Sequence, residues 1–86
     1  MPHSHRYERR RKLEVMYNSN KRLFEYAEAL RQEAVAQNKP EIADTLANIM
    51  VKCMDIRKEL DTLSKPFTGY PLAMIVGRSN WSKSES

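Results

Sequence analysis

The sequence predicts an all-α protein: an antiparallel two-helix hairpin with a basic N-terminal arm and a C-terminal tail that packs back or docks on a partner. Three features predict this fold: apolar residues at helical spacing in residues 42–63, a second helical pattern in residues 13–37, and a very short joint between the two. The chain has 86 residues, enough for one domain. Its 30% charged residues and two glycines suit a helical domain. We expect an arm at 1–12, a hairpin at 13–64 and a tail at 65–86.

The second helix has the clearest pattern. Its apolar residues alternate spacings of four and three, which predicts a heptad seam at Ile42, Leu46, Ile49, Cys53, Ile56, Leu60 and Leu63. Pro40 suits the first position of a helix, and Pro66 disfavours a helical residue before it. We therefore expect this helix to run from about Pro40 to about Ser64.

The first helix shows two heptad columns. One holds Leu13, Asn20, Ala27 and Ala34, and the other holds Met16, Leu23, Leu30 and Gln37. Residues 17–20 form helices weakly, which leaves a bend there open, although we expect the helix to continue. Only Asn38 and Lys39 separate this pattern from Pro40, and so short a joint folds the two helices back against each other.

Positive charge is concentrated in the arm. The whole chain carries +4, and residues 1–12 hold five Lys and Arg against one Glu, whereas the remaining charges cancel. The candidate binding residues of the arm are Arg6, Tyr7, Arg9, Arg10, Arg11 and Lys12. Three interpretations remain open: binding to nucleic-acid phosphates with Tyr7 stacked on a base, binding to an acidic protein surface, or a solvated helix start.

The tail combines two prolines and both glycines with an apolar run at residues 72–76. This run either folds back to cover the hairpin, or adds to a sheet edge or fills a groove of a larger protein. The candidate docking residues are Phe67, Tyr70, Pro71, Leu72, Met74, Ile75, Val76 and Trp81. The bond between Tyr70 and Pro71 is also a candidate target for a prolyl isomerase. We expect the residues after Trp81 to be disordered.

The sequence shows no set of residues for catalysis. His3 and His5 have no further ligands at metal-binding spacing, and Cys53 falls on the predicted seam, where a free cysteine packs as a small apolar residue. We therefore expect no enzymatic activity, metal or cofactor. The single cysteine forms no internal disulfide, and no apolar run has the length of a signal peptide core or a membrane span. These features predict a cytoplasmic protein that does not enter a membrane.

One seam between two helices buries little apolar surface for a domain of this size. The chain therefore needs a folded-back tail, a homodimer or a larger protein partner. Our first hypothesis is a non-enzymatic protein-interaction module that binds and modulates a larger partner, such as a nucleic-acid-processing enzyme. The alternative is a direct, sequence-tolerant nucleic-acid-binding protein that uses the arm. In size and charge alone, the chain resembles accessory proteins of phages and mobile elements, which implies a role as an inhibitor or adaptor of a host nucleic-acid machine.

Overall fold

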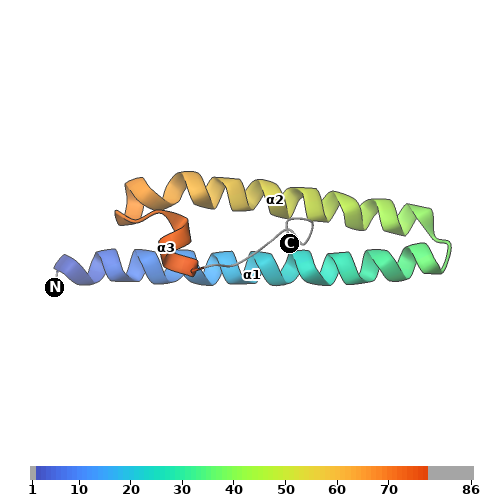
Figure 1. Ribbon diagram of the computed structural model, residues 1–86, viewed down its shortest axis with the longest axis horizontal. Coiled ribbons are helices and arrows are strands. Elements are labelled where there is room, and N and C mark those ends of the chain that lie inside the picture. The colour runs from blue at the N-terminus through green and yellow to red at the C-terminus, as the bar shows by residue number, and fades with distance from the viewer. Residues whose placement is uncertain (1, 78–86) are drawn as a thin grey trace.

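The computed structural model describes residues 2–77, with side chains from Tyr7 onward. It contains three helices: α1 (Pro2–Ala36), α2 (Pro40–Thr68) and the short α3 (Leu72–Val76). Helices α1 and α2 lie antiparallel in a rod 55 Å long, and α3 packs on both near the N-terminal end of α1 (Figure 1). The part of the chain that the model describes contains no strand. The predicted all-α hairpin is confirmed.

Helix α1 is longer than expected and unbroken. It begins at Pro2 instead of near Leu13, so the basic arm forms its first turns. The possible bend at residues 17–20 is absent, and Tyr17 and Asn20 are buried. Packing against the rest of the hairpin therefore outweighs the weak helix propensity of this stretch.

Helix α2 also extends beyond its predicted end at Ser64. It continues through Pro66 and stops at Gly69, whose φ of 89° is left-handed and whose N–H donates to the Lys65 carbonyl at 2.8 Å. Proline removes one helical hydrogen bond, here to the carbonyl of Thr62, but both residues are exposed and water can reach that carbonyl. The capping glycine, and not the proline, sets the end of this helix.

The helix interface contains only part of the predicted seam. Ile42, Ile56 and Leu63, which the heptad pattern placed in the seam, are 50, 44 and 41% exposed. Cys53 and Leu60 of the predicted seam are buried, and Leu46 and Ile49 are half-buried. The other buried residues of α2, outside the seam, are Ala43, Ser64 and Thr68. On α1, the predicted column of Leu13, Asn20, Ala27 and Ala34 is buried, while Met16, Leu23 and Leu30 are about half exposed. Small side chains at the buried positions let the helices approach closely, which rotates the larger apolar residues to the edge.

The core cluster lies toward the end of the hairpin that carries α3. It consists of Leu13, Tyr17, Cys53, Leu60 and Leu72, with Phe24, Ile49 and Val76 packed against it. Leu72 and Ile75 of α3 are both buried. Of the two interpretations of the tail, packing back is therefore the one observed for residues 72–76.

Asn20 links α1 to α2 through a buried side-chain hydrogen bond. Its Nδ2 donates to the carbonyl oxygen of Cys53 at 2.8 Å, whereas its Oδ1 is buried without a partner. A buried polar residue of this kind adds little net stability but fixes how two helices align along their axes. Asn20 thus sets the register of the hairpin.

The Asn20→Asp substitution tests this bond. Aspartate keeps the shape but loses the donor and brings a carboxylate beside the Cys53 carbonyl, so we expect the free energy of unfolding to fall by about 2–3 kcal/mol at neutral pH. Urea unfolding followed by circular dichroism measures the change. The matched control is Asn18→Asp, at an exposed site of the same helix; equal effects of both substitutions would show that the Asn20 bond is unimportant.

A second substitution tests whether α3 belongs to the core. Leu72 is 5% exposed, so Leu72→Ala leaves a cavity and should lower the free energy of unfolding by about 2–5 kcal/mol. Met74→Ala, two residues away at a site 64% exposed, should change it by less than about 0.5 kcal/mol. A Leu72→Ala protein as stable as the wild type would mean that α3 does not pack on the hairpin in solution.

Candidate functional site

The two predicted groups of binding residues meet at one end of the hairpin, which we call the open end. Here the first turns of α1 lie beside the last turn of α2 and beside α3 (Figure 1). The guanidinium carbon of Arg9 lies 4.7 Å from the centre of the Phe67 ring, and that of Arg10 lies 5.4 Å from the centre of the Tyr70 ring. Both distances are in the range of cation–π contacts. We name the combined surface the open-end patch; it consists of Arg9, Arg10, Arg11, Lys12, Phe67, Tyr70 and Met74.

Stacking holds the arginines in place while leaving much of their hydrogen-bonding capacity free. Arg9 Nη1 donates one long bond, 3.4 Å, to the Phe67 carbonyl. A guanidinium stacked on a ring through its face still presents N–H donors along its edge, and that edge matches a carboxylate or a phosphate. Because the side chains are partly ordered beforehand, a bound anion would cost less conformational entropy.

The aromatic residues of the patch are positioned by a turn with two buried hydroxyl groups. Ser64 Oγ donates to the Tyr70 carbonyl at 2.8 Å, and Thr68 Oγ1 donates to the Ser64 carbonyl at 2.8 Å. The Tyr70 N–H in turn donates to Thr68 Oγ1 at 3.1 Å. Both hydroxyl-bearing residues are at most 1% exposed. Together with Gly69 they reverse the chain after α2, which brings Tyr70 under Arg10 and leads into α3.

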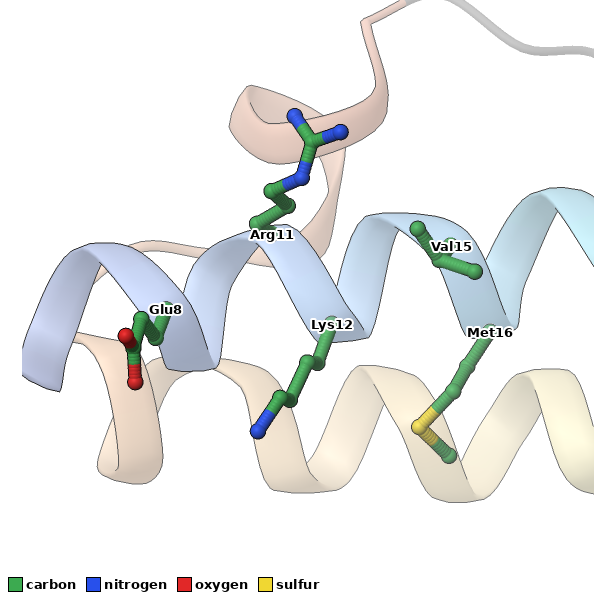
Figure 2. Close-up of a pocket in the computed structure, with 5 residues that line it drawn as sticks. All are labelled: Glu8, Arg11, Lys12, Val15 and Met16. Atoms are coloured by element: carbon green, nitrogen blue, oxygen red, sulfur yellow. The ribbon is translucent and has the colours of Figure 1, made fainter.

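A shallow groove runs beside the patch on the outer face of α1. Figure 2 shows its lining residues: Glu8, Arg11, Lys12, Val15 and Met16. Lys12 and Met16 point to the side of α1 on which α2 is drawn, whereas Arg11 points to the side of α3. A second groove on the α2 side contains Glu8, Lys12 and Met16 again and adds Leu63 and Phe67. The surface is thus mixed, with a carboxylate and apolar groups among the cations.

The predicted docking residues divide into two groups. Leu72 and Ile75 are buried and Val76 is half-buried, so α3 in this position cannot offer them to a partner. Phe67, Tyr70, Pro71 and Met74 are exposed, as is Tyr7 on α1. The peptide bond before Pro71 is trans, and its recognition by a prolyl isomerase stays a prediction. The side chain of Arg6, Trp81 and the predicted disordered end lie outside the described residues.

Cys53 is a free cysteine buried in the core. Burial raises the pKa of the Cys53 thiol, which therefore stays protonated near neutral pH. No three His, Cys, Asp or Glu side chains within these residues are grouped to hold a metal ion, and no helix among them has the length and apolarity to cross a membrane. The side chains of His3 and His5 lie outside the description.

The hydroxyl-bearing residues that build the turn were not among those predicted from the sequence. Ser64 and Thr68 are polar, so a search for apolar periodicity passes over them. A signal for this helix end was present in the sequence. Ser64 and Thr68 are one helical turn apart and come just ahead of Gly69, a spacing that suits a helix end where hydroxyl groups bond to the backbone.

The Ser64→Ala substitution tests the turn. It leaves the Tyr70 carbonyl without the Ser64 donor, so we expect the free energy of unfolding to fall by about 1–3 kcal/mol in urea unfolding. Thr62→Ala, at an exposed site on the same helix, serves as control and should change it by less than about 0.5 kcal/mol. If Ser64→Ala is as mild as the control, the hydroxyl groups do not hold the turn.

Comparisons with known proteins assign no family to this architecture. No protein-family model, curated protein or solved structure matches the chain.

Proposed function

We propose that the protein is a non-enzymatic interaction module that binds an acidic surface of a larger protein through its open-end patch. The observation that carries this proposal is a pair of cation–π contacts. Arg9 contacts Phe67, 58 residues further along the chain, and Arg10 contacts Tyr70, 60 residues further along. Arginine, aromatic residues and methionine are the residue types enriched in protein interfaces. Met74, at 64% exposure, adds an apolar contact beside them.

The charge pattern favours a protein partner over nucleic acid. At the open end, taken as residues 7–17 and 57–70, seven Lys and Arg accompany four Asp and Glu. Glu8 lines both grooves together with Lys12, and a carboxylate there would repel a phosphate backbone. A protein surface, which carries charges of both signs and apolar groups, complements such a mixture better.

The partner class follows from the general likeness noted above. In size and charge the chain resembles accessory proteins of phages and mobile elements, so we propose a nucleic-acid-processing enzyme as the larger partner. Binding by such a rod would change this enzyme by covering part of its surface or by recruiting it, which are the roles of an inhibitor and of an adaptor.

Direct binding to nucleic acid is the second candidate, and two features favour it. Residues 9–12 are four consecutive cations, all exposed. Tyr7, at 61% exposure, is a ring on which a base could stack. This function would use α1 alone, whereas the first candidate uses α1 together with the end of α2.

Affinity capture with a nuclease step separates the two candidates. The intact chain is immobilised and exposed to native extract, before and after complete nuclease digestion. We expect a protein to be retained in both cases and to be lost with the double variant Arg10→Ala and Arg11→Ala. The control is Arg22→Ala with Arg31→Ala, which removes the same charge from exposed sites of the same helix.

A labelled 20-nucleotide single strand provides the direct comparison. If the strand binds tightly in low salt, loses affinity steeply as salt rises, and is released by the Arg10→Ala and Arg11→Ala variant alone, the second candidate holds. The first candidate is contradicted if protein is retained before nuclease digestion but not after it, because nucleic acid would then bridge the two proteins.

A further inference from the structure

One long face of the hairpin carries apolar side chains that no part of the described chain covers. On α1, Met16, Leu23 and Leu30 repeat every seven residues and are 51, 49 and 53% exposed. On α2, Ile42, Ile56 and Leu63 follow the same repeat, with half-buried Ile49 completing the column. A seven-residue repeat keeps each column on one side of its helix. We call the two columns together the apolar face.

The two columns lie on the same side of the hairpin. Met16 of α1 and Leu63 of α2 line one groove, so these positions are level. Because the helices are antiparallel, moving seven residues along each brings Leu23 level with Ile56, and a further seven brings Leu30 level with Ile49. The face therefore continues from the open end to the loop end.

Helix α3 covers the other side of the hairpin. Its Leu72 joins a cluster with Tyr17, and its Val76 packs against that cluster together with Phe24. Tyr17 and Met16 are neighbours on α1, about 100° apart around the helix, and so face different sides. In Figure 2, Met16 points to the side of α1 where α2 lies, and Arg11 points to the side of α3. The fold thus buries one flank of the seam and leaves the apolar face open.

The charges of the two ends are complementary. The open end, residues 7–17 and 57–70, has an excess of three positive charges, with seven Lys and Arg against four Asp and Glu. The loop end, residues 28–48, has an excess of two negative charges, with four Asp and Glu against two Lys and Arg. Two copies that pack face to face in opposite directions therefore place each positive end beside a negative end.

We propose that the apolar face binds a second copy of the chain, forming an antiparallel four-helix bundle. The two-fold axis crosses the rods at right angles near Leu23, so that α1 packs on the α1 of the other copy. Leu23 then meets its own counterpart, and Met16 of each copy meets Leu30 of the other. Such an interface uses the same patch on both subunits, which the repeat of each column permits. This packing leaves free the α3 side of each open end, to which Arg11 points. Lys12 and Phe67 of the patch share a groove with Met16 and Leu63 and so lie beside the second copy.

Sedimentation equilibrium of the full chain tests the association. We expect twice the chain mass of 10.1 kDa at micromolar concentration. Ile56→Glu should raise the dissociation constant by about 100-fold or more, because two-fold symmetry places each charge in the interface twice. Leu23→Glu is the second variant, and Val51→Glu, at an exposed site on another side of α2, is the control that should remain dimeric. Circular dichroism confirms that each variant is folded.

Cross-linking with a short bis-maleimide tests the orientation. Leu23→Cys should cross-link to itself in the dimer, whereas Met16→Cys should cross-link only when mixed with Leu30→Cys. The native Cys53 is 1% exposed and serves as an internal blank. A wild-type chain that stays monomeric at high micromolar concentration, a dimer that survives both glutamate variants, or a Met16→Cys protein that cross-links to itself would each overturn the proposal.

Discussion

The fold depends on the contact between Leu72 of α3 and the apolar cluster around Cys53. The two long helices face each other through small residues over much of their length, so the seam alone buries few large side chains. The cluster of Leu13, Tyr17, Cys53 and Leu60 is the exception, and Leu72 covers it. The contact between Arg10 and Tyr70 goes with this packing, because α3 reaches the cluster only when the chain reverses at Gly69 and brings Tyr70 back toward α1.

The same reversal of the chain at Gly69 also places an aromatic residue of the proposed binding surface, Tyr70, beside Arg10. Buried hydroxyl groups of Ser64 and Thr68 satisfy the backbone of the turn, and the rings of Phe67 and Tyr70 are then presented to Arg9 and Arg10. The arginines of the first turns oppose the dipole of α1. Their positions are supported instead by the rings of Phe67 in α2 and Tyr70 in the following turn. The residues predicted as a separate arm are therefore part of one surface with the end of α2.

Much of the architecture could be predicted from the sequence, because apolar spacing and a two-residue joint are local signals. The exact face of contact could not be. Apolar periodicity placed both the buried pair Cys53 and Leu60 and the exposed Ile42, Ile56 and Leu63 in one seam. The buried small and hydroxyl-bearing residues Ala43, Ser64 and Thr68 decide which of these two sets faces α1. Hydroxyl groups and amides do not contribute to apolar periodicity. Pro66 led to the wrong prediction that α2 ends near Ser64. The contact between the predicted arm and the predicted tail depends on where α2 ends. Both groups of residues could therefore be predicted from the sequence, but their contact with each other could not.

The central claim is that α3 closes the core over Cys53, and the reactivity of this thiol tests it most directly. The thiol is 1% exposed and burial raises its pKa, so in the full chain at about pH 8 we predict that a thiol reagent modifies Cys53 only as fast as the protein opens. Leu72→Ala should speed this modification strongly, and the unfolded chain in urea gives the upper limit. A full chain whose Cys53 reacts at the unfolded rate under native conditions would contradict the account.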